Sequence, residues 1–255
     1  MKYLVDYPLV LFAVAFPALW LASAAGGWLR MRDGSGGRGR AKGFDLIGGA
    51  ILSLLALLIG FTFSMASSRY DQRKNLEGIE ANAIGTELQR AQLLPPPDAA
   101  RVRDLLRAYT EQRVLFFENL GDAQTLARIN RTTDQLEGQL WDAVKGPAIA
   151  QPNPLTVLVV SSMNEVLDAR GYTQAAIWNR VPKAAWYLMT IIALWSSVLI
   201  GYGAIDSRSW RRLGLAMPLA ISVSFLLIAD IDCPQHGLIR LQPENLKGIA
   251  QSFGH

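Results

Sequence analysis

The sequence has little cysteine and little histidine, and these two shortages exclude several kinds of site. The 255-residue chain contains one cysteine, Cys233, and two histidines, His236 and His255. A disulfide within the chain and a metal site with two cysteine ligands are therefore excluded. Neither histidine has a partner at metal-site spacing, so we expect no zinc centre and no histidine-based catalytic site.

The sequence also lacks the local motifs of common enzyme classes. It shows no nucleophile motif and no dinucleotide fingerprint, and the glycine-rich residues 30–42 lack the spacing and the preceding strand of a phosphate loop. Runs of alternating β-branched residues are missing from residues 69–180, which argues against a sheet there. We therefore predict an all-α protein that is not an enzyme and holds no cofactor or metal.

Apolar residues are abundant and stand in separate blocks. Hydrophobic residues make up 51% of the chain, and its net charge is +4. The basic residues flank the apolar blocks and do not alternate with aromatics, so a nucleic-acid partner is not expected. Four blocks are long enough to cross a lipid bilayer as helices: residues 7–29, 44–68, 183–205 and 213–231.

These blocks divide the chain into four parts. Residues 1–68 and 183–232 form two transmembrane hairpins, residues 69–182 an extramembrane helical domain, and residues 233–255 a short tail. Apolar residues recur at spacings of three and four in the domain, which predicts a bundle of amphipathic helices. The helix of the second span should continue to Leu94, before Pro95. A later helix should end at Gly146 and Pro147.

The first block could also be read as a secretory signal peptide. Residues 21–24 resemble a cleavage site with small side chains. However, the segment before the block has only Lys2 against Asp6, and the apolar run exceeds the usual ~7–15 residues. A retained first helix is therefore the preferred interpretation.

Four spans place the helical domain and both ends of the chain on one side of the membrane. The two short connections lie on the other side, with five basic residues in 30–42 and three in 206–212. Because positive charge in short loops favours the cytoplasm, we expect these connections to be cytoplasmic. Basic residues beside the helical domain give a competing bias.

Small residues follow one face of the second span. They are Gly49, Ser53, Ala56, Gly60, Ser64 and Ser67. This stripe is expected either to pack closely against another helix or to line a pore. Phe61 and Phe63 are the further pore-lining candidates, and because they lie ~200° apart on a helix, at most one can face the pore.

Two polar groups of residues could carry chemistry. Arg69, Arg180, Asp230 and Asp232 should emerge at the same membrane face. They are expected to form a salt-bridge network or a ring that attracts ions at a pore mouth. A metal site or an acid–base site built on the two carboxylates is the less favoured interpretation, because no histidine is nearby. The second group is Glu80, Asn82 and Thr86, interpreted as a hydrogen-bonded seam or as a ligand or ion site.

Three segments together resemble a known family. GFTFSMASSRYDQR at 60–73, EANAIGTEL at 80–88 and ADIDCPQHGLIRL at 229–241 are similar to the signature blocks of bestrophin-like bacterial membrane proteins. The resemblance implies a protein of the bacterial inner membrane, distantly similar to the bestrophin anion channels. Those channels are pentamers with four spans per subunit and a pore lined by the second span, so small inorganic ions are the implied cargo.

The sequence departs from the bestrophins in two respects. The bestrophin helical domain is cytoplasmic, whereas the charge bias here favours the opposite orientation. Asp230 and Asp232 offer too few oxygens for the ~6–8 that surround calcium, so calcium gating is not predicted. The alternative function is a non-conducting sensor or scaffold whose helical domain binds a ligand or partner.

Overall fold

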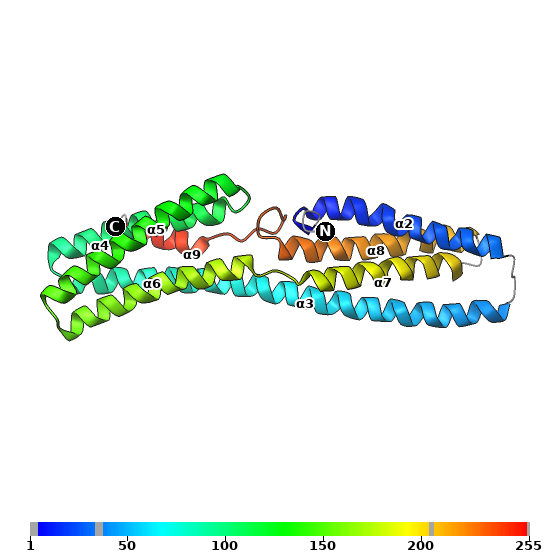
Figure 1. Ribbon diagram of the computed structural model, residues 1–255, viewed down its shortest axis with the longest axis horizontal. Coiled ribbons are helices and arrows are strands. Elements are labelled where there is room, and N and C mark those ends of the chain that lie inside the picture. Colours follow the sequence, from blue (N-terminus) through cyan, green and yellow to red (C-terminus); the bar gives the residue numbers. More distant parts are fainter. Residues whose placement is uncertain (1–4, 34–37, 204–206, 254–255) are drawn as a thin grey trace. The chain divides into compact units, whose positions relative to one another are not determined.

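The computed structural model describes residues 5–33, 38–203 and 207–253, and all regular structure within these ranges is helical (Figure 1). The helices are α2 (Pro8–Asp33), α3 (Arg38–Arg90), the short η1 (Ala91–Leu93), α4 (Pro96–Glu118), α5 (Ala123–Ala150), α6 (Pro154–Trp178), α7 (Lys183–Gly203), α8 (Ser207–Asp232) and α9 (Glu244–Ser252). The prediction of an all-α fold is confirmed.

Four stretches have the length and apolar composition of membrane-spanning helices. They are Pro8–Arg32, Ile47–Leu93, Pro154–Gly203 and Gly214–Asp232. Each overlaps one predicted span. The third and fourth of the predicted spans correspond to α7 and α8, and the stretch that contains α7 also takes in the apolar helix α6.

Internal contacts divide the chain into two compact units. The first contains residues 1–68 and 180–239, and the second contains residues 69–179 and 240–255. The residues after 239 thus pack with the helical domain, although the sequence suggested a separate tail. Helix α3 contributes its first part to the first unit and its last part to the second.

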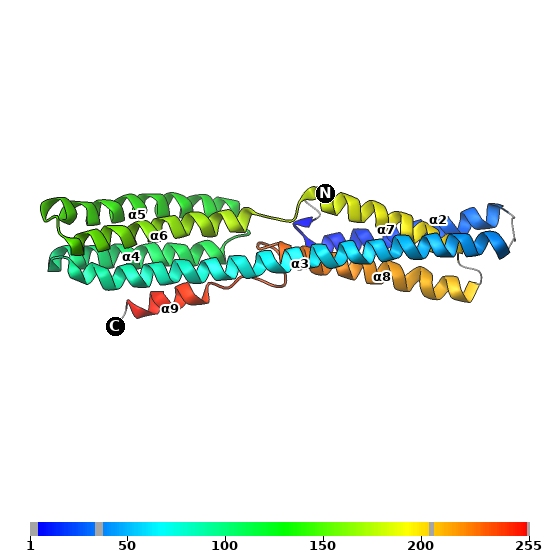
Figure 2. The same cartoon turned by 90° about the horizontal axis from the view of Figure 1, so that it is seen from below.

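In the first unit, α2 packs against α7 and α8 (Figure 2). The contact between α2 and α7 depends on two glycines. A Cβ atom on Gly26 would lie 2.0 Å from the carbonyl oxygen of Val198, and one on Gly201 would lie 1.8 Å from that of Ser23. Any side chain would force the two backbones apart, so these glycines allow the close helix contact that is common between membrane helices.

In the second unit, the end of α3 joins α4, α5, α6 and α9 around an apolar core. Well-defined caps begin two of these helices. Asp122 accepts hydrogen bonds from the amides of Gln124 and Thr125, and Asn153 forms a capping box with Thr156. Such side chains satisfy amides that have no partner inside the helix, which fixes where α5 and α6 start.

One helix of this unit extends beyond its predicted end. The prediction that Gly146 and Pro147 stop a helix is wrong, because α5 continues to Ala150. Pro147 lacks a backbone N–H, which costs one hydrogen bond to the turn before it, but its own carbonyl still accepts from the Gln151 amide and so the last turn closes. Helix α6 runs to Trp178, and its apolar contacts with the core continue to Ile177.

Helix α9 is fixed to α3 by a buried glutamate. Glu77 accepts hydrogen bonds from the Asn245 side chain at 2.6 Å and from the Leu246 amide at 2.9 Å. A carboxylate at the first turn of a helix satisfies open amides and complements the helix dipole. Leu246 and Phe253 add apolar contacts to the core, so the C-terminal segment is part of this unit.

Candidate functional site

The small-residue stripe of α3 is exposed in the first unit. Gly49, Ser53, Ala56, Gly60 and Ser64 are exposed, and Ser67 is half-buried. Apart from the neighbouring backbone of α3 itself, no described atom lies within 4 Å of a Cβ built on Gly49 or Gly60. The described part of the chain therefore does not use this stripe for its own helix packing.

Helix α3 packs against its own unit through a different face. Leu55, Thr62 and Ala66 are buried there, and their spacings of seven and four place them on one side of the helix. Leu54, Leu57 and Phe61 are bulky and exposed, and they lie on the flank between the buried face and the small stripe. The helix thus has three faces with different surroundings.

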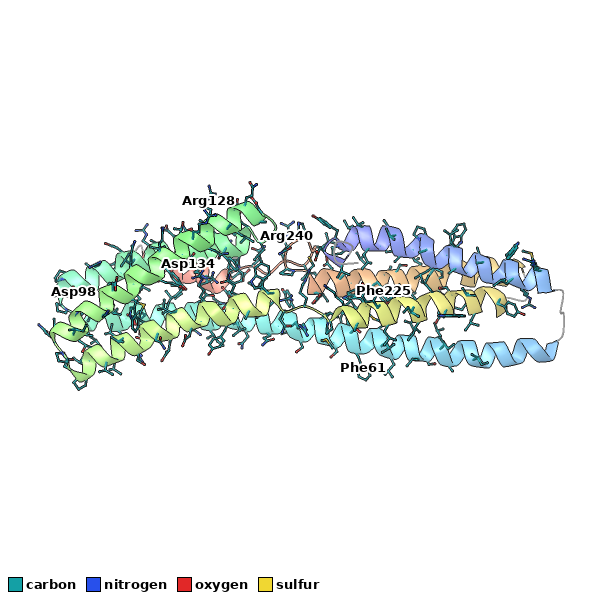
Figure 3. All side chains as sticks on the ribbon, in the orientation of Figure 1. Phe61, Asp98, Arg128, Asp134, Phe225 and Arg240 are labelled. Carbon is teal, nitrogen blue, oxygen red and sulfur yellow. The ribbon has the colours of Figure 1, made fainter. Side chains whose placement is uncertain are left out.

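Helical geometry distinguishes Phe63 from Phe61. At about 100° per residue, Phe63 lies about 50° from the centre of the small stripe and Phe61 about 105° from it. Phe61 is 63% exposed and Phe63 39% exposed. Figure 3 shows Phe61 pointing away from the neighbouring helix α7. Phe63 is therefore the aromatic residue that borders the stripe.

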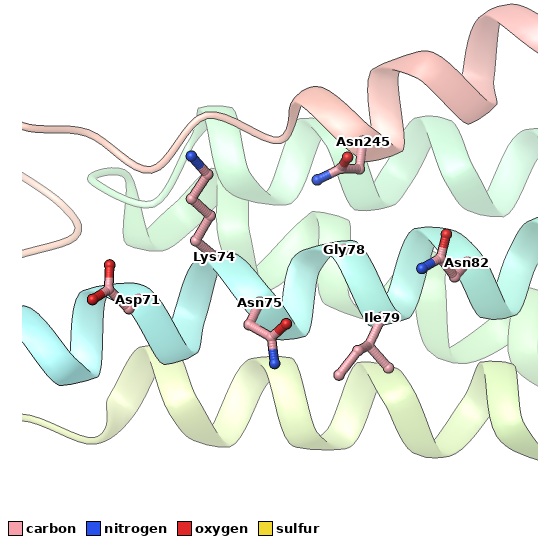
Figure 4. A pocket seen from close by; sticks show the side chains of 7 residues that line it. All are labelled: Asp71, Lys74, Asn75, Gly78, Ile79, Asn82 and Asn245. Atoms are coloured by element: carbon pink, nitrogen blue, oxygen red, sulfur yellow. The ribbon is translucent and has the colours of Figure 1, made fainter.

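The same helical spacing leads from the stripe into a polar groove in the second unit. Spacings of four, three, four and four residues connect Ser67 with Asp71, Lys74, Gly78 and Asn82. These four residues, with Asn75, Ile79 and Asn245, line an open groove of about 390 Å³ (Figure 4). Lys74 extends toward the α9 side of α3, whereas Asn75 and Ile79 extend toward α6.

The buried face of α3 in the second unit carries charged residues. Arg73, Glu77, Glu80 and Glu87 are all at most 1% exposed. Glu80 forms a two-point ion pair with Arg113 of α4, with N–O distances of 2.5 and 3.2 Å. The Arg113 guanidinium also stacks on Phe116 at 4.5 Å from the ring centre. This pair organises the core and offers no access to a ligand.

The structure separates the three residues predicted as a polar seam. Glu80 is buried against Arg113, Asn82 is exposed in the groove, and Thr86 is half-buried. Sequence reasoning did not identify Arg113, Glu77 or Glu87 as members of the polar interior. Their signal was available, because Glu77, Glu80 and Glu87 recur at three and seven residues, on a side of the helix away from the stripe.

Glu87 is a titratable group inside the α3–α6 contact. It accepts a hydrogen bond from the Ser162 hydroxyl, and its second oxygen is buried without a partner among the described residues. Burial raises the pKa of Glu87 to about 7, and the nearby Glu165 adds to this rise. The Ser162 hydrogen bond and Arg90 act in the opposite direction. The group therefore changes charge near neutral pH.

The predicted charge network is distributed over both units. In the first unit, Arg180 pairs with Asp6, and its Nε lies 3.8 Å from an oxygen of Asp232. Asp230 accepts hydrogen bonds from the backbone amides of Leu238 and Ile239, so it fixes the turn after α8. Sequence reasoning missed Asp6, which is distant in the chain.

Arg69 of the predicted network belongs to the second unit. Its guanidinium donates a hydrogen bond to the Asn179 side chain. Across the described ranges, no group of three or more histidine, cysteine or acidic residues is placed to hold a metal ion.

Comparison with known proteins shows the same architecture elsewhere. The Bestrophin-like domain matches residues 15–246 of the sequence. A mutant of a bacterial bestrophin homolog from Klebsiella pneumoniae has 18% identity and a TM-score of 0.66, covering 94% of this chain and 96% of that one. A structure of the same homolog phased on zinc gives 17% identity, a TM-score of 0.66 and 96% coverage of both chains. No curated protein matches this sequence.

Proposed function

This chain belongs to the Bestrophin-like family, and from that membership we propose that it is a homo-oligomeric ion channel whose α3 helices line the pore. The observation that carries the proposal is the stripe of small and hydroxyl-bearing residues on α3. It is exposed in the single chain, and the chain packs α3 through its opposite face.

A membrane-spanning helix seldom presents such a face to lipid. Hydroxyls and uncovered backbone gain nothing from hydrocarbon, whereas the bulky residues on the flank of α3 are suited to it. When several copies surround an axis, the small stripe faces water and ions, and the flank meets lipid or the neighbouring subunit. A pentamer is the arrangement that the family resemblance suggests.

The proposed pore narrows at Phe63, the aromatic residue that borders the stripe. We expect the variant Phe63→Ala to conduct severalfold more current per channel than the wild type, because the alanine widens the narrowest part of the pore. The matched control is Phe61→Ala, which removes the same side chain from the flank. Single-channel recording of the purified protein in planar bilayers measures both variants.

Two outcomes of this experiment contradict the proposal. If the wild type and both variants carry no current, the protein is not a channel, and the sensor or scaffold becomes the better assignment. If Phe61→Ala raises the conductance and Phe63→Ala does not, a different face of α3 lines the pore.

We also propose that the two basic connections lie in the cytoplasm and the helical unit outside it, as the charge bias favours. A cysteine placed at the exposed residue Gln124 should then react with a membrane-impermeant maleimide in intact cells. The wild type is the control, because its one cysteine, Cys233, is buried. If Gln124→Cys is labelled only after cell lysis, the helical unit lies in the cytoplasm and the proposed orientation is wrong.

A further inference from the structure

The exposed face of α3 carries two residues of opposite charge just beyond the membrane-spanning part. Asp71 and Lys74 stand at the spacing of the small stripe, and both line the polar groove of the second unit. Residues three apart are displaced by about 4.5 Å along a helix. The two charges therefore lie at neighbouring levels on the face that we assign to the pore.

These two side chains differ from most charged residues around them. Arg73, Glu77 and Glu80 are buried, and each has a partner inside the second unit. In contrast, Asp71 and Lys74 are exposed, and within the described part of the chain the side chain of neither forms an ion pair or a hydrogen bond. The fold thus turns the other charges inward and leaves this pair available to solvent.

Apart from Asp71 and Lys74, the residues that line the groove carry no charge. Asn75, Asn82 and Asn245 contribute carboxamides to the groove, and Gly78 leaves its centre free of a side chain. Carboxamides can interact with ions of either sign. Selection between cations and anions in the groove must therefore come from Asp71 and Lys74.

We infer that Asp71 and Lys74 form two adjacent rings of opposite charge in the oligomer, and that the balance between these rings sets the ion selectivity of the channel. This inference rests on the proposed function. The rings are about 4.5 Å apart, which is shorter than the Debye length of ~8 Å at physiological salt, so a passing ion experiences both. The wild type is then weakly selective by charge, because the two fields oppose each other.

The test measures the permeability ratio of potassium to chloride from reversal potentials in a salt gradient. Asp71→Asn leaves the lysine ring alone and should shift the ratio toward chloride. Lys74→Gln leaves the aspartate ring and should shift it toward potassium. Each shift should be roughly fivefold or more, as expected when one unit charge acts at about 4 Å through water. The double variant should return close to the wild-type ratio.

Helix α5 provides a matched control. Asp142 and Lys145 are exposed, have the same three-residue spacing and belong to the same unit, but they do not line the groove. Neutralising either of them should leave the permeability ratio unchanged. An equal shift in these controls would overturn the inference, because a general surface-charge effect would then explain the result.

The failure of this inference can be distinguished from failure of the channel itself. Conducting variants with an unchanged ratio overturn the role of Asp71 and Lys74 and leave the channel in place, whereas a silent wild type removes both. If a neutralised variant carries no current, the swapped variant Asp71→Lys/Lys74→Asp tests the inference instead. It preserves the balance and should conduct with a ratio near that of the wild type; a strongly shifted ratio contradicts the inference.

Discussion

Replacement of Arg113 by leucine is expected to lower the free energy of unfolding of the helical unit by about 3–5 kcal/mol. The substitution leaves Glu80 without its charged partner in a core where its side chain is 0% exposed. Both of its charged hydrogen bonds and the stacking on Phe116 are lost at the same time. Chemical unfolding of the purified chain in detergent, followed by a probe in this unit, measures the change.

Two further variants isolate the cause of this effect. The double variant Glu80→Leu/Arg113→Leu removes both charges and should recover most of the lost stability, because apolar residues can replace a buried ion pair with little cost. Arg107→Leu breaks the exposed pair with Glu111 on the same helix and should cost less than about 1 kcal/mol. If the double variant is as unstable as Arg113→Leu, packing and not the unpaired charge is responsible.

The second large effect is expected from Glu87 and depends on pH. Its pKa in the folded chain is about 7, against an ordinary value of 4.5. The folded state therefore keeps a proton that the unfolded state has already released. The contribution of this group to stability is complete below pH 4.5, falls as the pH rises toward 7, and stays low above it. The total change is about 3 kcal/mol, at about 1.4 kcal/mol per pKa unit.

Glu87→Gln removes this dependence, because the amide cannot ionise and can still accept the Ser162 hydrogen bond. The variant should match the wild type near pH 4 and be more stable by up to about 3 kcal/mol at pH 8. Thermal unfolding at several pH values, compared between the two proteins, measures the difference. Glu111→Gln changes an exposed glutamate and serves as control. Parallel pH curves for wild type and Glu87→Gln would contradict the assigned pKa.

Local sequence patterns predicted the elements of this fold better than their ends. The continuation of the second-span helix to Arg90 followed from the absence of a breaker before Pro95. The end at Pro147 was predicted wrongly, because a proline disturbs the turn before it, whereas its own carbonyl still accepts a hydrogen bond from the Gln151 amide, and α5 continues to Ala150. Helix propensity is a property of a single residue, whereas the position of a helix end depends on the interactions of the whole helix.

For the candidate site too, the sequence predicted local features better than it predicted the partners of individual residues. The small stripe of α3 was visible in the sequence, because helical periodicity is a local property. The sequence could not decide whether the stripe packs inside the chain; that required the buried positions of Leu55, Thr62 and Ala66. Asn82 and Thr86 were grouped with Glu80 on spacing and polarity, but Glu80 turns toward Arg113, a partner 33 residues away.

The sequence by itself determined the all-α class, the four spans, the family segments and the small face of the second-span helix. Each of these depends on the order and spacing of residues that are close together in the sequence. The tertiary structure decided which face of α3 is buried, that Glu77 holds α9, and that Arg180 meets Asp6 and Asp232. These pairings join residues far apart in the chain, and only packing of the helices brings their charges within reach of one another.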